Sequence, residues 1–432
     1  MASCEHWLFA GLRVSMLAEE RMAKTRSGSA STGNMALLDQ GPAATGNGVA
    51  LWAIGFRPFF LLAALSAVLL VPFWLSVLLL DLTWPSPLPA PFWHAHEMLF
   101  GYTSAVIAGF LLTATQNWTG QVTARGGLLV GLAALWLAAR LLCALGGSLP
   151  PVFTAAVDLA FLLAVALCVA RPIARTRNVR NAAMPVLLLA LASANALWWF
   201  GVIELDALSI LRGQRIALDV IALLIMVIGG RIIPGFTANA VPGLTTRSRS
   251  ALDVIGVLSM AALLAVDTAA PRADAAAYCA ALAAAFNGVR LWGWGGSRAL
   301  GRPILAVLHV GFACTCAALG LRAYALLTSA MLESTATHLL TVGGIGLMTF
   351  GMMARVALGH TGRPLVLPWS IVVAIVAIGA SALVRVLGPL LQPGHYPGVL
   401  LVSGSLWTLA FALFLAHYTP ILIAARADGK PG

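Results

Sequence analysis

Long apolar runs alternate with short polar breaks along nearly the whole chain after about residue 50. A helix that crosses a bilayer needs roughly 20 mostly apolar residues, and each run is about that long. The pattern therefore predicts an all-α, polytopic transmembrane bundle with no aqueous domain between its helices. Twelve spans are expected, near residues 57–80, 95–117, 127–145, 152–170, 183–203, 213–233, 251–267, 275–293, 303–327, 335–357, 368–391 and 398–424.

The first 48 residues differ from the rest of the chain. Small polar residues dominate Ser27–Ser31 and Thr45–Gly48, and no apolar run in this part reaches spanning length. We interpret residues 1–48 as a flexible cytoplasmic tail, with Met35 as an alternative start. Residues 49–432 are then expected to form a single membrane domain.

The composition excludes other classes of protein. Of the 432 residues, 60% are hydrophobic and 9% are charged, whereas an ordinary globular domain has about 25% charged residues. Such a chain cannot build a charged soluble surface, and it is too apolar to remain disordered. The net charge of +11 is attributed to cytoplasmic loops, so no nucleic-acid partner is expected. Five cysteines in apolar stretches are interpreted as small core residues: Cys143, Cys168, Cys279, Cys314 and Cys316.

Basic residues fall in alternate loops. If the N-terminus is cytoplasmic, the cytoplasmic connections contain Arg125, Arg171, Arg175, Arg177, Arg180, Arg247, Arg249, Arg298, Arg302, Arg363, Arg426 and Lys430. The opposite loops have only two arginines and several acidic residues: Arg212, Arg272, Asp81, Glu204, Asp206, Asp267, Asp274 and Glu333. The positive-inside rule therefore predicts an even number of spans, with both termini in the cytoplasm.

The densest group of polar side chains in a predicted span is the segment Trp93–Met98. On a regular α-helix, His94, Glu97 and Met98 share one face, and His96 points roughly the opposite way. Imidazole and thioether groups are expected ligands for haem iron or copper. Glu97 could orient a histidine or take up protons. The alternative is that these residues only cap the helix at the membrane interface.

Further histidines define two levels in the predicted membrane. His338 lies near the outer end of the tenth span, and the glycine-rich segment Thr341–Gly346 after it could face a neighbouring helix or a planar macrocycle. His309 and His360 lie toward the cytoplasmic side. Any one of them could instead be a core histidine whose hydrogen bonds are satisfied.

Charged residues within the spans are further candidates. Arg231, near the end of the sixth span, either anchors the membrane edge or binds an anion such as a haem propionate. Pro234 and Gly235 are expected to break the helix after it. Asp158 and Asp219 lie in mid-span, where they could join a polar path or pair with an arginine. No phosphate-binding loop or serine or cysteine nucleophile motif is evident.

These motifs together resemble the NnrS family, bacterial membrane proteins that contain haem and copper and are associated with the nitric oxide response. The resemblance covers nearly everything after Leu51. It runs in order through Gly55–Phe60, Trp93–Gly101, Gly109–Ala114, Asn117–Gly120, Gly229–Pro234, Leu308–Gly311, His338–Gly343, Leu358–Pro364 and Tyr418–Leu422.

The resemblance implies a multi-pass protein of the bacterial inner membrane that binds b-type haem and copper. It implies metal ligands among the matching histidines His94, His96, His309, His338 and His360. The expected cofactor contacts are His94, His96, His338 and Arg231, supported by Glu97 and Met98.

The chain also departs from the family pattern. Where a histidine is expected in the fifth span it reads Leu197–Phe200, and Asn287 stands where a histidine is expected in the eighth. If those family histidines bind metal, this chain lacks one centre.

Three functions remain open from the sequence. The first is haem binding, with redox or binding chemistry toward nitric oxide or a related small molecule under nitrosative stress. The second is a transporter that moves protons or metal ions along buried histidine and carboxylate groups. The third is a membrane protection or assembly factor without turnover. In each case the lipid bilayer is a partner of the protein.

Overall fold

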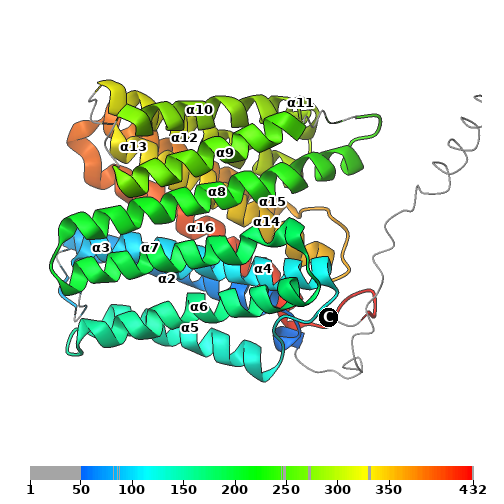
Figure 1. The fold of residues 1–432 in the computed structure, drawn as a ribbon, viewed down its shortest axis with the longest axis horizontal. Coiled ribbons are helices and arrows are strands. Elements are labelled where there is room, and N and C mark those ends of the chain that lie inside the picture. The colour runs from blue at the N-terminus through cyan, green and yellow to red at the C-terminus, as the bar shows by residue number, and fades with distance from the viewer. Residues whose placement is uncertain are drawn as a thin grey trace, which may run out of the picture. The chain divides into compact units, whose positions relative to one another are not determined.

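The computed structural model describes residues 50–80, 82–84, 86, 88–244, 246, 250–270, 274–328 and 332–430. The predicted tail, residues 1–48, and the loop residues Asp81, Arg247, Arg249 and Arg272 lie outside these ranges. Within them the chain is almost entirely helical and contains no strand (Figure 1). The all-α prediction is therefore confirmed.

The elements follow one another with short connections. In chain order they are η1 (Ala50–Trp52), α2 (Phe56–Leu80), α3 (Ala90–His96), η2 (Glu97–Thr103), α4 (Ser104–Thr119), α5 (Gly127–Leu145), α6 (Pro151–Arg175), η3 (Val179–Asn181), α7 (Ala183–Ile203), α8 (Ala207–Ala240), α9 (Ser250–Ala269), α10 (Asp274–Trp292), α11 (Gly296–Ala299), α12 (Pro303–Thr328), α13 (Glu333–His338), η4 (Leu339–Gly346), α14 (Leu347–His360), α15 (Trp369–Leu391), η5 (Pro393–His395) and α16 (Tyr396–Ile423).

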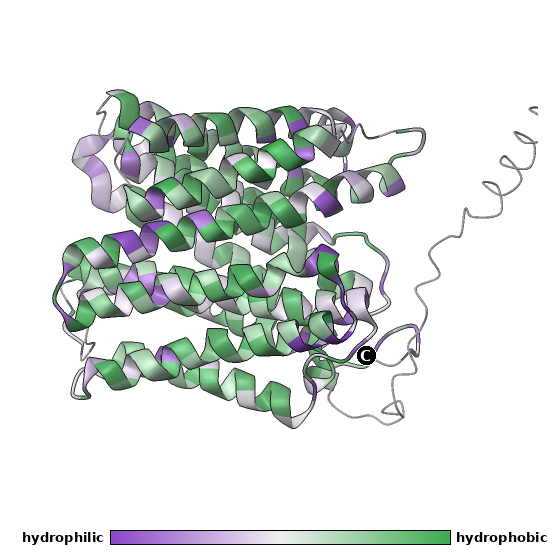
Figure 2. Cartoon of the chain, viewed as in Figure 1, coloured by the Kyte–Doolittle hydropathy of each residue, from purple (hydrophilic) through white to green (hydrophobic). Residues whose placement is uncertain are grey.

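Eleven helices of the described part are long and apolar enough to cross a membrane. Four of them are composite: α3, η2 and α4 run on as one span, as do α13, η4 and α14, while η3 leads into α7 and η5 leads into α16. The predicted span 275–293 corresponds to α10, which packs against α9 and α12 but is less apolar because it carries Asn287 and Arg290. Hydrophobic residues cover most of the helices (Figure 2). The chain is thus a multi-pass membrane protein.

Local sequence signals explain several helix ends. Pro151 opens α6, where its missing N–H has no partner to lose. Asp206 caps α8 by accepting a hydrogen bond from the Leu208 N–H at 3.0 Å. Gly120 ends α4 in a left-handed conformation, with φ of 69°. These signals place the polar breaks between spans.

The prediction that Pro234 and Gly235 break the sixth span is wrong. Helix α8 continues through both residues to Ala240. A proline removes only one backbone donor, and membrane helices tolerate this where neighbouring helices surround the site. Pro234 is itself buried among such neighbours.

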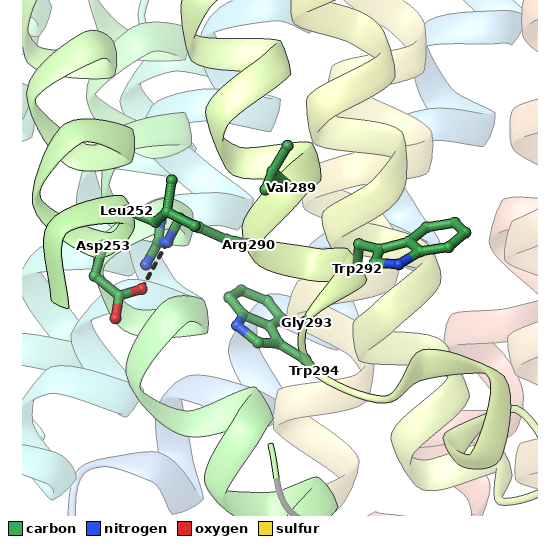
Figure 3. A pocket seen from close by; sticks show the side chains of 7 residues that line it. All are labelled: Leu252, Asp253, Val289, Arg290, Trp292, Gly293 and Trp294. Carbon is green, nitrogen blue, oxygen red and sulfur yellow. Dashed lines mark hydrogen bonds and ion pairs between the residues drawn. The ribbon is translucent and has the colours of Figure 1, made fainter. Parts of the chain in front are cut away.

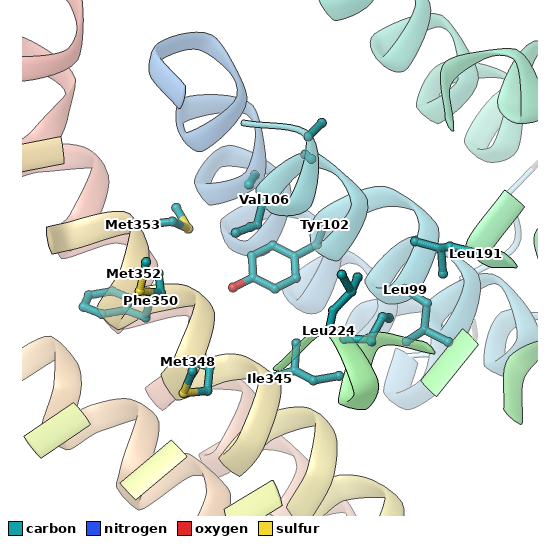
Figure 4. Packing of buried hydrophobic residues seen from close by; sticks show 14 of the residues in the cluster. Leu99, Tyr102, Val106, Leu191, Leu224, Ile345, Met348, Phe350, Met352 and Met353 are labelled. Carbon is teal, nitrogen blue, oxygen red and sulfur yellow. The ribbon is translucent and has the colours of Figure 1, made fainter. Parts of the chain in front are cut away.

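Apolar side chains fill the space between η2, α8 and α14. Tyr102 and Leu99 of η2 face Leu224 of α8 and the methionines Met348 and Met352 of α14 (Figure 4). The Tyr102 hydroxyl lies 2.7 Å from the Thr349 Oγ1 and gives this layer one polar contact. Because lipid tails are as apolar as these side chains, close van der Waals packing rather than the hydrophobic effect holds the helices together.

Hydrogen bonds from two arginines mark one end of the bundle. There the Arg57 guanidinium donates to the carbonyls of Leu422 and Ala424, at 2.8 and 2.7 Å. Beside it Arg426 donates to the His360 carbonyl at 2.8 Å. We call this the basic end, where α2 begins and α14 and α16 finish. The other, where α2 finishes and α3 begins, is called the opposite end.

The orientation of the bundle in the membrane is a prediction that labelling can test. With Arg175→Cys or His395→Cys in place, we expect a membrane-impermeant maleimide added from the periplasm to label position 395 and not 175. The parent chain with its native cysteines gives the background. Periplasmic labelling at position 175 would contradict the basic loops being cytoplasmic.

Candidate functional site

Two of the histidine-bearing spans become π-helical directly after a histidine. The π-helix η2 begins at Glu97, after His94 and His96, and the π-helix η4 begins at Leu339, after His338. Such wide turns are rare and occur often at functional sites. His94 and Glu97, expected on one face, contact different helices, because His94 meets α2 and Glu97 meets α5.

His94 packs flat against Trp74 of α2. The two ring centroids are 4.0 Å apart and the ring planes differ by 19°. The His94 Nδ1 is buried and has no hydrogen-bond partner in the described part of the chain. An electrostatic interaction relates the side chain to His338. His94 is therefore a fixed imidazole with an unused ring nitrogen.

His338 has both ring nitrogens engaged. Its Nδ1–H donates to the Ser334 carbonyl at 2.7 Å, and its Nε2 accepts a hydrogen bond from Arg385 at 3.1 Å. Arg385 also donates to the Tyr396 hydroxyl at 3.1 Å. The Arg385 side chain is buried, and among the described residues it forms no ion pair. A buried cation without a counter-charge is costly, so this position suits an anionic group.

The glycines after His338 serve helix packing. A Cβ on Gly344 would lie 2.6 Å from the Thr315 Oγ1 of α12, and one on Gly343 would lie 3.1 Å from the Cys314 Cβ. A Cβ on Gly346 would meet the Trp407 ring of α16 at 2.8 Å. Of the two sequence interpretations, a neighbouring helix therefore fits these glycines and a macrocycle does not.

His96 lies in a separate, fully buried cluster. Its Nδ1 is 3.2 Å from the Glu97 Oε1, and its Nε2 is 3.1 Å from the Asp158 Oδ2 and 3.2 Å from the Asn195 Oδ1. Each of these partner oxygens is an acceptor, so both ring nitrogens donate. His96 is then an imidazolium, and an imidazolium has no lone pair for a metal ion.

Arg140 of α5 completes this cluster. Its guanidinium donates to the Glu97 Oε1 at 2.5 Å and forms a second, short contact with the Asp158 carboxylate. The Asp158 Oδ2 also accepts from Asn195 and Trp199, at 2.7 and 3.0 Å. Two cations, Arg140 and protonated His96, thus balance two carboxylates in a site shielded from solvent.

Cys143 adds a third kind of donor atom. Ligand atoms of His96, Glu97 and Cys143 lie within 4.8 Å of one another, and all three residues are buried. The sequence analysis treated Cys143 as a core residue, and its burial agrees with that. Its place beside a histidine and a carboxylate was not foreseen.

Arg140, Asn195 and Trp199 belong to this cluster but are not among the candidate residues predicted from the sequence. An arginine inside the apolar run 127–145 is itself a signal, since intramembrane charges are usually functional or paired. Asn195, a polar residue within an apolar run, is a weaker signal of the same kind, whereas nothing in the sequence marks Trp199. The rings of Trp198 and Trp199, where the family resemblance led us to expect a histidine, pack on His96.

The histidines toward the basic end are not brought together by any contact in the structure. The His309 Nδ1 donates to the Leu305 carbonyl at 3.1 Å, and its Nε2 lies 3.5 Å from the Thr237 Oγ1. The His360 ring packs against Phe56, with centroids 5.7 Å apart. Each side chain is thus accounted for by its local surroundings.

Arg231 lies at the basic end, far along α8 from the helix start near His94 and His338. It donates to the Asn181 Oδ1 at 2.9 Å and to the Arg180 carbonyl at 3.1 Å, beside a cleft of about 360 Å³. Its side chain is exposed. The structure therefore favours the membrane-edge anchor over a propionate contact at His94 and His338.

Met98 is half-buried and packs against the core.

Asn287, which stands where a family histidine was expected, is part of a structural group. It donates to the carbonyls of Gly256 and Ala283, both at 2.9 Å, and accepts from Arg290 at 2.5 Å. Arg290 forms an ion pair with Asp253 at 2.8 Å (Figure 3). The adjoining pocket, of about 170 Å³, lies at the ends of α9 and α10.

Comparison with known proteins identifies the family. The family model described as NnrS protein matches residues 50–426, which include every element described above. A search among curated proteins found no match. The family match, the membrane helices and the histidine-bearing spans agree with one another. The chain therefore belongs to the NnrS protein family.

Proposed function

We propose that this protein binds haem through His94 and His338 and acts in the bacterial inner membrane in the response to nitric oxide. The observation that supports this most is His94, a half-buried imidazole that interacts electrostatically with His338 and whose buried Nδ1 has no hydrogen-bond partner among the described residues. Haem iron commonly takes axial imidazole ligands. Bound there, the iron would supply a centre for redox chemistry or for binding a diatomic gas.

The surrounding residues suit this role. Trp74 fixes the His94 ring by stacking, and the Ser334 carbonyl holds the His338 Nδ1 proton, so its Nε2 carries the lone pair. Arg385 now donates to that Nε2. A carboxylate is a stronger partner for a guanidinium than a neutral imidazole is. A haem propionate near Arg385 would therefore both balance its charge and release the His338 lone pair.

The donor set for copper fits less well. His96, Glu97 and Cys143 offer nitrogen, oxygen and sulfur within 4.8 Å. However, His96 donates from both nitrogens to neighbouring acceptors, and Arg140 holds Glu97. A metal ion there would need deprotonated ligands and would displace the ion pairs. We therefore assign no copper to this cluster.

The haem proposal predicts a selective loss of the visible spectrum. His94→Ala and His338→Ala should each remove more than half of the haem absorbance and iron of the purified protein. The control is His417→Ala, because His417 lies near the end of α16 at the basic end of the bundle, where its ring packs against Tyr418. If His94→Ala and His338→Ala both keep the wild-type spectrum, the assignment is wrong, and His309 and His360 become the candidate haem ligands.

A transporter is the second candidate function. It is favoured by the buried ionic cluster of His96, Arg140 and Asp158, since charges within membrane spans often mark proton or ion paths. A protein that purifies without haem and moves protons or metal ions across vesicle membranes would support it. Haem absorbance thus separates the two functions.

A further inference from the structure

A second buried ionic cluster joins α8, α9 and α12. Arg322 of α12 makes a two-point contact with Asp267 of α9, in which both nitrogen–oxygen distances are 2.6 Å. Asp219 of α8 lies next to this pair, with its Oδ1 3.9 Å from the Arg322 guanidinium. Both aspartates are at most 1% exposed. The cluster shares no residue with the haem site or with the His96 cluster.

Asp219 lacks the donors that a buried carboxylate needs. Neither of its oxygens accepts a hydrogen bond from a described residue. Its carboxyl group shares one guanidinium nitrogen with that of Asp267, because the Arg322 Nη1 lies 2.6 Å from the Asp267 Oδ2 and 3.9 Å from the Asp219 Oδ1. Two ionised carboxylates gathered at one nitrogen have no hydrogen to share with each other. Arg322 already donates its hydrogen bond to Asp267. An ionised Asp219 would therefore be both unsatisfied and next to a like charge in a medium of low dielectric.

Asp158 shows what a satisfied carboxylate looks like in the same bundle. It is buried to a similar degree, at 2% exposure, but its oxygens accept from Arg140, Asn195 and Trp199. Nearly all buried polar groups in proteins are paired in this way. Asp219 is an exception, because neither of its oxygens has a described donor. A second carboxylate, that of Asp267, lies at the same Arg322 nitrogen.

We propose that Asp219 and Asp267 bind one proton between them and form a proton-exchange site inside the membrane. A proton from water bonds to an Asp219 oxygen, and the resulting O–H donates to the Asp267 carboxylate. No other bond changes, and the charge of the cluster rises by one. The other charged groups that face the pair are Arg215 on α8, Arg322 on α12 and Glu333 at the start of α13.

Carbodiimide labelling tests this on the full-length protein. Dicyclohexylcarbodiimide modifies protonated carboxyl groups in apolar surroundings, and mass spectrometry locates the adduct. At neutral pH we expect the adduct on Asp219 or Asp267, its loss in Asp219→Asn, and no adduct on Asp158. Equal labelling of Asp158, or none on either member of the pair, would overturn the proposal. Protection by sodium but not by choline would also overturn it, in favour of a metal cation.

Infrared spectroscopy of the wild-type protein provides a second readout. A protonated buried carboxyl group gives a C=O band that shifts in D₂O, and we expect this band to disappear in Asp219→Asn. That variant should fold, because an asparagine of the same shape can donate to Asp267. Asp428 is exposed, so the control variant Asp428→Asn should keep the band. A wild-type spectrum without any such band would refute the shared proton, whatever the haem content of the protein.

Discussion

Arg140→Met is expected to destabilise the folded protein by about 3–5 kcal/mol, because it leaves two buried carboxylates without their shared cation. Arg140 is 7% exposed and bridges Glu97 and Asp158 from a third helix. Its removal would leave His96 to balance two negative charges alone. Thermal unfolding of the purified protein in detergent measures the loss, as a lower midpoint or as a failure to accumulate in the membrane.

Two comparisons make this result specific to the buried network. The triple variant Arg140→Met, Glu97→Gln and Asp158→Asn removes the Arg140 charge together with both carboxylate charges, so that His96 can lose its extra proton. It should recover much of the lost stability. Arg363 lies at the basic end and its side chain is half-exposed, so Arg363→Met should change the stability by no more than about 0.5 kcal/mol. A single Arg140→Met variant as stable as the wild type would show that the network contributes little.

Gly213→Ala is expected to cost about 1–3 kcal/mol, through overpacking between α7 and α8. A Cβ at this position would lie 2.7 Å from both the Ala194 carbonyl oxygen and the Trp198 nitrogen. These are backbone atoms, which cannot rotate away as a side chain can, so the helices must move apart. Since α7 carries Asn195, the displacement should also loosen the His96 cluster.

The matched control for this substitution is Gly131→Ala in α5. A Cβ there meets nothing within 4 Å, so the change only replaces a helix-interior glycine by a better helix former. We expect it to leave stability unchanged or to raise it by up to about 1 kcal/mol. Equal unfolding midpoints for the two variants would contradict the close approach of α7 and α8.

The sequence by itself determined the class of protein, the approximate spans and the family. These properties follow from local facts. A segment of sufficient length and apolarity must be helical in a bilayer, since its backbone hydrogen bonds have to be satisfied within the segment. For the same reason the mid-span carboxylates Asp158 and Asp219 could be singled out as unusual, although their partners could not be named.

Only the tertiary structure decided which polar groups meet. Helix packing brought Glu97 against Arg140, and it directed His94 and His96 to different helices although only one residue lies between them. Packing also gathered Asp219 and Asp267 at the same nitrogen of Arg322 and left the Asp219 oxygens without a described hydrogen-bond donor. Such pairings depend on how helices distant in sequence rotate and approach. That arrangement is set by the summed side-chain contacts of the whole bundle, and no single segment of the sequence encodes it.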